Sequence, residues 1–210
     1  MQNKNISPAV VNRLPRYYRY LEDLLRADIA KISSKELSAL MNVTASQIRQ
    51  DFNCFGEFGH QGYGYNVRRL HEELGRIIGV ERKFTAVIVG AGNLGRTIAK
   101  SGMFARRGLV LRALFDIDAG IIGQEIAGLE VLGAALMADY CRDNNIDIAV
   151  LTLPKQATLQ AANILAAAGV RGFWNFSNTE IKLGGVVAEN MHMGDSLMTL
   201  CYNLNNNQRS

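Results

Sequence analysis

The sequence predicts an α/β protein in which a winged helix-turn-helix domain precedes a doubly wound parallel sheet. Two observations lead to this prediction. Residues 11–53 carry three helical patterns separated by tight turns, which is typical of a helix-turn-helix. From residue 84 onward, short apolar strand patterns alternate with helical ones, as in a parallel sheet covered by helices. We therefore expect one domain at residues 1–80 and a second at 81–194, with a C-terminal helix and tail at 195–210.

The composition excludes several classes of protein. Hydrophobic residues make up 48% of the chain, enough for a core, but the apolar runs are short, such as Thr85–Val89. A membrane-spanning helix needs about 20 apolar residues, so we expect none. Residues 1–8 carry no apolar signal segment, so a cytoplasmic protein is expected. The three cysteines are widely spaced and predict neither a disulfide framework nor a metal site.

The N-terminal domain opens with two predicted helices. The first is an amphipathic helix over Val11–Ala27, whose leucines and tyrosines recur every three or four residues. Pro15 falls near its start, where a missing N–H costs little. The second helix lies within Ile32–Met41. The pair Ser33-Ser34 supplies its N-cap, and Glu36 is placed to complete a capping box with the first of these serines.

A tight turn and a third helix follow. Asn42 suits the turn, because Asn tolerates the left-handed conformation better than most residues. Thr44 and Gln47 form a second pair with capping-box spacing, and this predicts a helix that runs to about Asn53. The second and third helices together form the expected helix-turn-helix.

The segment Phe55–Tyr65 interleaves four glycines with aromatic residues and cannot propagate a helix. A hairpin fits it, and after a helix-turn-helix such a hairpin would be a wing. His60 and Gln61 at its tip are candidates for minor-groove contacts, although a simple exposed turn explains them equally well. Residues 67–78 are helical again and close the domain.

The third helix is the predicted DNA-reading element, since the start of that helix enters the major groove in this motif. Residues 1–53 carry a net charge of +3, against +1 for residues 81–210, which favours a nucleic-acid partner for the first domain. The polar face of the helix offers arginine for guanine and glutamine for adenine. The same face would also suit a solvated helix in some other three-helix domain. The predicted DNA-binding residues, besides the two at the wing tip, are Arg13, Arg16, Ser46, Gln47, Arg49, Gln50 and Tyr65.

The second domain alternates strands and helices. The strands are expected at 84–89, 109–115, 146–153 and 170–174. The helices are expected from the glycine-rich turn at 90–95 to about Ala105, at 134–144 and at 155–168. A last helix over Ser196–Asn205 has four apolar side chains on one face, Leu197, Leu200, Cys201 and Leu204. Docking of that face onto its own domain is the commoner fate of such a helix.

A dinucleotide site is predicted at the glycine-rich turn. Gly90 permits a tight turn, Gly92 lets the backbone approach a pyrophosphate, and Gly95 lets the helix pack against the strand. The helix N-terminus supplies N–H groups for the phosphates. Asp116, at the end of the next strand, would accept the ribose hydroxyls and repel a 2′-phosphate, which favours NADH and NAD⁺ over their phosphorylated forms.

The remaining cofactor-binding candidates adjoin these residues or lie at the same sheet edge. Thr152 and Pro154 close a strand where ligands bind in such folds, although a plain strand-end turn would need no ligand. The full set beyond the three glycines and Asp116 is Ala91, Asn93, Leu94, Ile117, Thr152, Leu153, Pro154 and Phe176.

Several motifs taken together resemble one known family. They are Ser33-Ser-Lys-Glu-Leu37, Gln47-Ile-Arg-Gln-Asp-Phe52, Phe55-Gly-Glu-Phe-Gly59, Gly62-Tyr-Gly-Tyr-Asn66, Gly90-Ala-Gly-Asn-Leu-Gly95, Phe115-Asp-Ile-Asp118, Trp174-Asn-Phe176 and Glu189-Asn190. The chain resembles the Rex family of redox-sensing transcriptional repressors from about Ile6 to Leu204.

This resemblance implies a function and an assembly. It implies a repressor that binds palindromic operator DNA as a homodimer, senses the NADH/NAD⁺ ratio through a Rossmann domain and is released by NADH. It also implies that the C-terminal helix is exchanged between subunits.

Two positions depart from the family pattern. Ser101 stands where many members carry Tyr, and His192 stands where several carry Asp. Together with an arginine matching Arg19, those positions belong to a polar relay that helps to distinguish the two redox states, so the form of this relay here is left open. His192 also reads as an ordinary structural histidine.

The rival class is an NAD-dependent dehydrogenase. Such an enzyme needs a second lobe with an acid or base for its substrate. The extra lobe here holds about 80 residues and no catalytic constellation, because no nucleophile or metal spacing joins His60, His71 and His192. We therefore expect no enzymatic activity. A NAD-binding scaffold without DNA would leave the polar face of the third helix unexplained.

Overall fold

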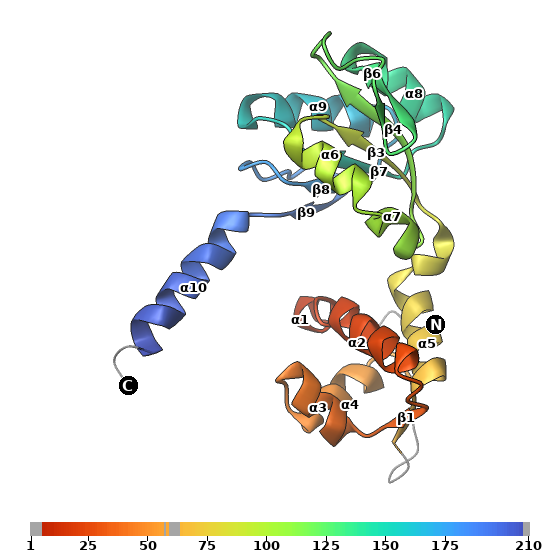
Figure 1. Ribbon diagram of the computed structural model, residues 1–210, viewed down its shortest axis with the longest axis vertical. Coiled ribbons are helices and arrows are strands. Elements are labelled where there is room, and N and C mark those ends of the chain that lie inside the picture. Colours follow the sequence, from red (N-terminus) through yellow and green to blue (C-terminus); the bar gives the residue numbers. More distant parts are fainter. Residues whose placement is uncertain (1–5, 57, 59–63, 208–210) are drawn as a thin grey trace. The chain divides into compact units, whose positions relative to one another are not determined.

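The computed structural model describes residues 6–56, 58 and 64–207. The chain divides into two compact units, residues 1–81 and 82–210 (Figure 1). The first unit has one apolar core, and the second has one on each face of its sheet. This division places the C-terminal helix with the second unit. The three-part domain division expected from the sequence stays a prediction.

The N-terminal unit is a group of helices closed by a two-stranded ladder. Its elements are α1 (Pro8–Val11), α2 (Leu14–Arg26), β1 (Lys31–Ile32), α3 (Ser34–Met41), α4 (Ala45–Asn53), β2 (Tyr65–Asn66) and α5 (Val67–Ile78). Helices α2 to α5 turn their apolar faces inward. Their fully buried side chains include Tyr17, Leu21, Leu37, Ile48, Phe52, Leu70 and Leu74.

The helix starts follow the predicted caps with one exception. Ser33 and Glu36 form the complete capping box: the Glu36 N–H donates to Ser33 Oγ over 3.1 Å and the Ser33 N–H donates to Glu36 Oε2 over 2.8 Å. Asn42 adopts the left-handed conformation, with φ of 53°. Thr44 caps α4 by accepting the Gln47 N–H over 3.1 Å. A full capping box would also need the Gln47 side chain to accept the Thr44 N–H. That part of the prediction was wrong, because the Gln47 side chain bonds elsewhere, as described below.

The helix predicted over residues 11–27 is confirmed as α2, which begins at Leu14 rather than Val11. A separate short helix, α1, precedes it and ends at Val11. Pro15 accounts for the break, because its ring would clash with the carbonyl of Val11 four residues earlier in a continuous helix.

Only the end of the segment predicted to form the wing lies in a described strand. There β1 and β2 pair antiparallel, with Lys31 opposite Asn66 and Ile32 opposite Tyr65. Most of the predicted hairpin, including its tip, lies outside the described residues. The helix expected at 67–78 is confirmed as α5.

The second unit contains one seven-stranded sheet and its helices. Its strands are β3 (Thr85–Val89), β4 (Val110–Asp116), β5 (Glu125–Ile126), β6 (Leu129–Gly133), β7 (Ile148–Leu151), β8 (Gly172–Asn175) and β9 (Val187–Asn190). Its helices are α6 (Asn93–Lys100), α7 (Met103–Arg106), η2 (Ala134–Leu136), α8 (Met137–Asp143), α9 (Lys155–Ala167) and α10 (Met193–Asn207), and η1 (Val80–Arg82) lies at the junction of the units.

The sheet has the order β5-β6-β4-β3-β7-β8-β9, and every pair is parallel except β5 with β6. Without the edge strand β5, this is the strand order of a Rossmann fold, in which the chain reverses direction across the sheet between β3 and β7. The predicted doubly wound parallel sheet is confirmed. Ligands bind in such sheets at the carboxyl edge beside that reversal.

Alternate residues of the central strands face opposite layers of helices. Val87, Val89 and Phe115 point into a core shared with α8 and α9, whereas Ile88 and Leu114 point into one shared with α6 and α7. Figure 1 shows the two helical layers flanking the sheet. Strands that are buried on both faces consist of nearly continuous apolar residues, which explains why these strands could be predicted from the sequence.

Three details of this unit differ from the sequence predictions. The helix expected from the glycine-rich turn to Ala105 is broken between α6 and α7, where Gly102 has a φ of +65°. The strands β5, β6 and β9 were missed. The C-terminal helix begins at Met193 rather than Ser196. No helix in the described part of the chain is long and apolar enough to cross a membrane.

Candidate functional site

The glycine-rich turn between β3 and α6 is shaped by close backbone contacts. Gly90 has a φ of +100°, and a Cβ placed on it would lie 2.6 Å from the Thr152 carbonyl oxygen. A Cβ on Gly95 would lie 2.0 Å from the Gly90 carbonyl oxygen. Only glycine fits at either position. The start of α6 therefore packs directly against the end of β3, as the spacing of the motif predicted.

Gly92 has a different environment. It is the N-cap residue of α6, and no heavy atom lies within 4 Å of a Cβ placed on it. No side chain caps this helix. The N–H groups of the first turn of a helix lack partners within the helix and carry a partial positive charge. Open space next to such a helix end is suited to an anion such as a pyrophosphate.

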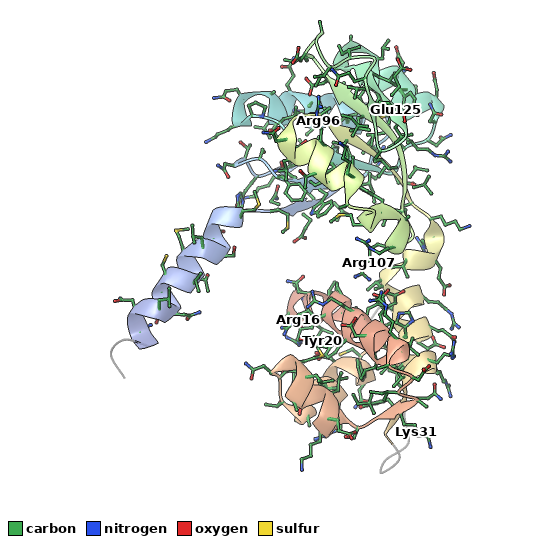
Figure 2. All side chains as sticks on the ribbon, in the orientation of Figure 1. Arg16, Tyr20, Lys31, Arg96, Arg107 and Glu125 are labelled. Atoms are coloured by element: carbon green, nitrogen blue, oxygen red, sulfur yellow. The ribbon has the colours of Figure 1, made fainter. Side chains whose placement is uncertain are left out.

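Asp116 fixes the other side of the turn. It ends β4, and its carboxylate accepts the N–H groups of Ala91 over 2.6 Å, Ile117 over 2.7 Å and Asp118 over 3.0 Å. Arg96 on α6 donates from Nε to the Ala91 carbonyl oxygen over 2.8 Å (Figure 2). The Ala91 peptide is thus held at both its polar atoms. A carboxylate oxygen can accept more than one hydrogen bond, so Oδ2 of Asp116 keeps capacity for a ligand hydroxyl.

A cavity of about 660 Å³ opens at this edge of the sheet. Seven predicted cofactor residues line it, namely Gly90, Gly92, Asp116, Ile117, Thr152, Leu153 and Pro154. The sequence reasoning missed its remaining lining, which is Val89, Phe115, Ala134, Ala135, Met137, Ala157, Gln160, Ala161 and Ile164. The alanines at the start of η2 and in the first two turns of α9, which follows Pro154, were a signal that could have found part of this lining.

The other predicted cofactor residues do not line the cavity. Ala91 is buried, and Asn93, Leu94 and Gly95 form the first turn of α6. Phe176 follows β8, and its ring centroid lies 4.6 Å from that of Trp174. Its assignment to the cofactor stays a prediction.

Thr152 joins the two strands beside the reversal point. Its Oγ1 donates to the Gly90 carbonyl oxygen over 2.6 Å, and its N–H donates to the Val89 carbonyl oxygen over 3.0 Å. It therefore both supports the glycine-rich turn and lines the cavity.

Helix α4 presents the candidate nucleic-acid surface of the first unit. Ser46, Arg49 and Gln50 are exposed, and Arg49 Nη1 donates to Ser34 Oγ over 3.0 Å. Gln47 is only half-exposed, and its Nε2 donates to Asp51 Oδ1 over 2.8 Å. The predicted reading face is thus present on the surface, with Gln47 at its inner border.

Asp51 is a fully buried carboxylate that organises this helix. Besides Gln47, it accepts Arg13 Nε over 2.6 Å, Arg13 Nη2 over 2.8 Å and Tyr17 Oη over 2.6 Å. Burial opposes ionisation of Asp51, but the hydrogen bonds from Arg13, Tyr17 and Gln47 outweigh it and hold its pKa below the ordinary value. Burial, followed by the hydrogen bond to Asp51, raises the pKa of Tyr17. This network, which the sequence reasoning missed, joins α2 to α4.

Comparison with known proteins identifies the family of the chain. Residues 5–53 match a family model described as "Putative DNA-binding protein N-terminus", and residues 81–179 match a "CoA binding domain". The redox-sensing transcriptional repressor Rex of Clostridioides difficile strain 630 is 51% identical over 201 residues, which is 95% of this chain and 96% of that protein. The Rex repressor of Caldicellulosiruptor bescii is 48% identical and covers 97% of this chain and 94% of its own. This chain belongs to the Rex family of redox-sensing transcriptional repressors.

Solved structures of a Rex-family repressor called RSP share the fold. RSP in complex with β-NAD⁺ and operator DNA aligns with a TM-score of 0.91 at 46% identity, covering 97% of this chain and 94% of its own. RSP in complex with β-NADH aligns with a TM-score of 0.90 at 42% identity, covering 98% and 97%. A Rex repressor is a regulator, so the dehydrogenase alternative is set aside.

Several predicted DNA contacts in this Rex chain have partners of their own. Arg13 is engaged by Asp51, and that hydrogen bond raises the pKa of its guanidinium. Arg16 on α2 donates to the Met41 carbonyl oxygen at the end of α3 over 2.9 Å (Figure 2). Tyr65 is half-buried, with its ring edge-to-face against Phe52 at 5.2 Å. These contacts serve the fold of the unit, and the DNA roles stay predictions. His60 and Gln61 lie outside the described residues.

The two departures from the Rex pattern have local partners. Ser101 Oγ donates to the Ile98 carbonyl oxygen over 2.6 Å at the end of α6. His192 is half-buried between β9 and α10. Arg19 lies in the other unit, with its guanidinium carbon 5.7 Å from the ring centroid of Tyr20. A relay among the three stays a prediction. In the part of the chain described, no three His, Cys, Asp or Glu side chains are grouped so that they could hold a metal ion.

Proposed function

We propose that this Rex chain binds operator DNA as a homodimer and is released from it when NADH fills the cavity at the carboxyl edge of the sheet. The observation that carries the proposal is the cradle formed by Gly92 and Asp116. Open space at the start of α6 stands beside a carboxylate that ends β4, next to a cavity of about 660 Å³. In this proposal the exposed polar face of α4 in the same chain contacts the operator DNA.

The residues of the cradle fit two groups of the dinucleotide, the pyrophosphate and the adenosine ribose. The free N–H groups at the start of α6 would hold the pyrophosphate, since a Cβ at Gly92 would meet only open space. Oδ2 of Asp116 would accept a ribose hydroxyl while keeping its bond to Ala91. Its negative charge would oppose a 2′-phosphate, which favours NAD(H) over NADP(H). When bound, the dinucleotide supplies a redox-dependent nicotinamide ring that acts here as a ligand.

The exposed face of α10 supports the pairing of two copies in this proposal. Leu197, Leu200 and Leu204 have exposed fractions of 61%, 53% and 53%. Large contiguous apolar surfaces on a protein mark interaction sites. We infer that α10 is exchanged with a second copy, which would bury this face. A dimer of this kind presents two copies of α4 to the two halves of a palindromic operator. We place the protein in the cytoplasm, where DNA and the NAD(H) pool are both accessible.

Linkage connects the two ligands. If NADH favours a dimer in which the two copies of α4 are wrongly spaced for the operator, it lowers operator affinity by the same factor by which DNA lowers NADH affinity. NAD⁺ would bind without that preference.

The proposal is tested by measuring operator affinity of the full chain by fluorescence anisotropy across NADH/NAD⁺ ratios. We expect affinity to fall as NADH replaces NAD⁺ at constant total nucleotide. NADPH at equal concentration is the control and should have a much smaller effect. Absorbance at 340 nm in the same samples should show no consumption of NADH. Operator affinity that stays constant across the full range of ratios would refute the proposal.

A further inference from the structure

The motifs Trp174-Asn-Phe176 and Glu189-Asn190 receive no explanation from the cofactor cradle or from α4. In the structure they meet. Asn175 is the last residue of β8, Asn190 is the last residue of β9, and the two are register partners. Asn175 is fully buried and Asn190 is half-exposed. Two polar side chains thus lie side by side at the carboxyl edge of the sheet.

The amide of Asn175 uses all its hydrogen-bonding capacity. Its Oδ1 accepts the Ser177 N–H over 3.0 Å and the Ser177 hydroxyl over 2.8 Å. Its Nδ2 donates to the Thr179 carbonyl oxygen and, over 2.9 Å, to Asn190 Oδ1. Asn190 Oδ1 also accepts the N–H of the buried Ile181 over 3.1 Å. In these contacts Asn190 acts only as an acceptor. A fully satisfied buried amide of this kind fixes one arrangement of the segments that it joins.

The joined segments lead in two directions. On one side, the Phe176 N–H donates to the Leu151 carbonyl oxygen over 2.9 Å, directly before Thr152, which supports the glycine-rich turn. On the other side, the Met191 N–H donates to the Asn175 carbonyl oxygen over 2.7 Å, two residues before α10 begins. A continuous series of hydrogen bonds and short backbone segments therefore runs from the cofactor cavity to the base of α10.

We propose that the Asn175–Asn190 hydrogen bond is a positioning contact that sets the direction in which the chain leaves β9 for α10, and so transmits the state of the cofactor cavity to the dimer. The inference rests on the proposed function, since it concerns how NADH reaches the operator-binding geometry. Neither asparagine lines the cavity, so a change here acts on the coupling between sites rather than on either site. Physical coupling of this kind needs an element with a defined geometry that both sites can bias.

Two isosteric substitutions with the same change in charge separate this role from simple packing. Asn190→Asp keeps an acceptor oxygen facing Asn175 Nδ2 and the Ile181 N–H. Asn175→Asp replaces the donor Nδ2 with an oxygen that faces Asn190 Oδ1 and the Thr179 carbonyl. Asn190→Leu removes the acceptor at a half-exposed position, where the chain is expected to fold even if Asn175→Asp does not.

Three quantities are measured for each full-length variant: operator affinity without nucleotide, NADH affinity, and the factor by which saturating NADH lowers operator affinity. For Asn190→Leu and Asn175→Asp we expect that factor to fall by about fivefold or more while both affinities stay within about twofold. Asn190→Asp should keep the wild-type factor.

The outcomes that contradict the inference are distinct. An unchanged factor in a folded Asn190→Leu protein, or equal losses in all three quantities, would overturn the positioning role while the proposed function stands. A wild-type protein whose operator affinity does not respond to NADH would overturn the proposed function, and this inference with it.

Discussion

Replacing Asp51 by Asn should destabilise the N-terminal unit by about 3 kcal/mol. The carboxylate is fully buried and accepts four hydrogen bonds, two from Arg13 and one each from Tyr17 and Gln47. An Asn side chain offers one acceptor oxygen instead of two. Its NH₂ group would face donors from Arg13 or Gln47, so at least one of these buried donors loses its partner.

The magnitude follows from the burial of the pair. Removing one partner of a buried ion pair costs about 3–5 kcal/mol, because the remaining charge is left without compensation. The Arg13 side chain is 22% exposed, so water can solvate part of the freed guanidinium. That exposure places the expected cost at the lower end of the range. The loss of stability should be local, since every partner of Asp51 named above lies on α2, on α4 or at the N-cap of α2.

Native-state hydrogen exchange of the full chain measures this loss by unit. Amides of α2 and α4 should exchange about a hundredfold faster in Asp51→Asn, while those of β3 serve as an internal reference and should not change. The matched control is Asp23→Asn on α2. Asp23 is 60% exposed and pairs with Arg26 at the surface, where such pairs contribute about 0–1 kcal/mol. Equal effects of the two substitutions would refute the reasoning.

The effect of pH has a definite sign. The pKa of Asp51 is lowered in the folded protein, whereas in the unfolded chain it is about 3.9. The unfolded chain therefore takes up the proton first as pH falls. The advantage of wild type over Asp51→Asn should be constant above about pH 5 and should shrink below about pH 4. An advantage that instead grew in that acidic range would contradict the assignment of a lowered pKa.

Four further predictions concern the two sites and the dimer. Arg49→Ala should weaken operator binding by about 1–3 kcal/mol and relax base preference at one position, measured with a panel of operator variants. Unchanged affinity in the folded protein would refute a base contact. Gly95→Ala should abolish NADH binding and lower stability, because its Cβ meets backbone, whereas Gly92→Ala should fold normally and lose NADH affinity only. Calorimetry and thermal unfolding compare the pair, and similar stability losses would contradict the open space at Gly92. Asp116→Ala should lower NADH affinity and narrow the preference over NADPH, so an unaltered preference would place selection elsewhere. Deletion from Asp195 onward should remove both the dimer and the NADH response, as light scattering and gel shift would show. A truncated dimer that still releases DNA on addition of NADH would contradict exchange of α10.

The parts of the fold that were predictable are those in which neighbouring residues decide the structure. The capping box of Ser33 and Glu36, the left-handed turn at Asn42 and the apolar run of β3 all depend on contacts within a few residues. The strand β9 was missed because it lies at the edge of the sheet with its four residues exposed or half-buried in alternation, so it carries no apolar run. Its existence depends on pairing with β8, which no local pattern shows.

The candidate sites, too, were predictable only where neighbouring residues decide the geometry. The spacing of Gly90, Gly92 and Gly95 located the cofactor turn, because Gly90 and Gly95 lie against backbone where only glycine fits and Gly92 borders the open space at the start of α6. Arg13 was interpreted as a contact to DNA because it is a cation on an amphipathic helix. The sequence does not show that the carboxylate of Asp51, 38 residues later, occupies its guanidinium. A charged side chain has the same appearance in a sequence whether its partner is a phosphate or a buried carboxylate.

The chemistry of the two nucleotides shows which of their groups the protein must sense to distinguish NADH from NAD⁺. NADH and NAD⁺ have identical adenosine and pyrophosphate groups and differ only in the nicotinamide ring. The contacts expected at Gly92 and Asp116 therefore bind NADH and NAD⁺ equally. Contacts that are equal for the two nucleotides cannot make one of them shift the conformation of the protein more than the other. Substitutions at these two positions should weaken both nucleotides by the same factor and leave their ratio unchanged. Discrimination must arise where the ring lies. The series of hydrogen bonds that starts at the Leu151 carbonyl, next to Thr152, and continues at Asn175 leads from the cavity toward α10. A change in ring charge sensed along that path needs no movement of the glycine-rich turn, which agrees with the two hydrogen bonds that already fix the Ala91 peptide.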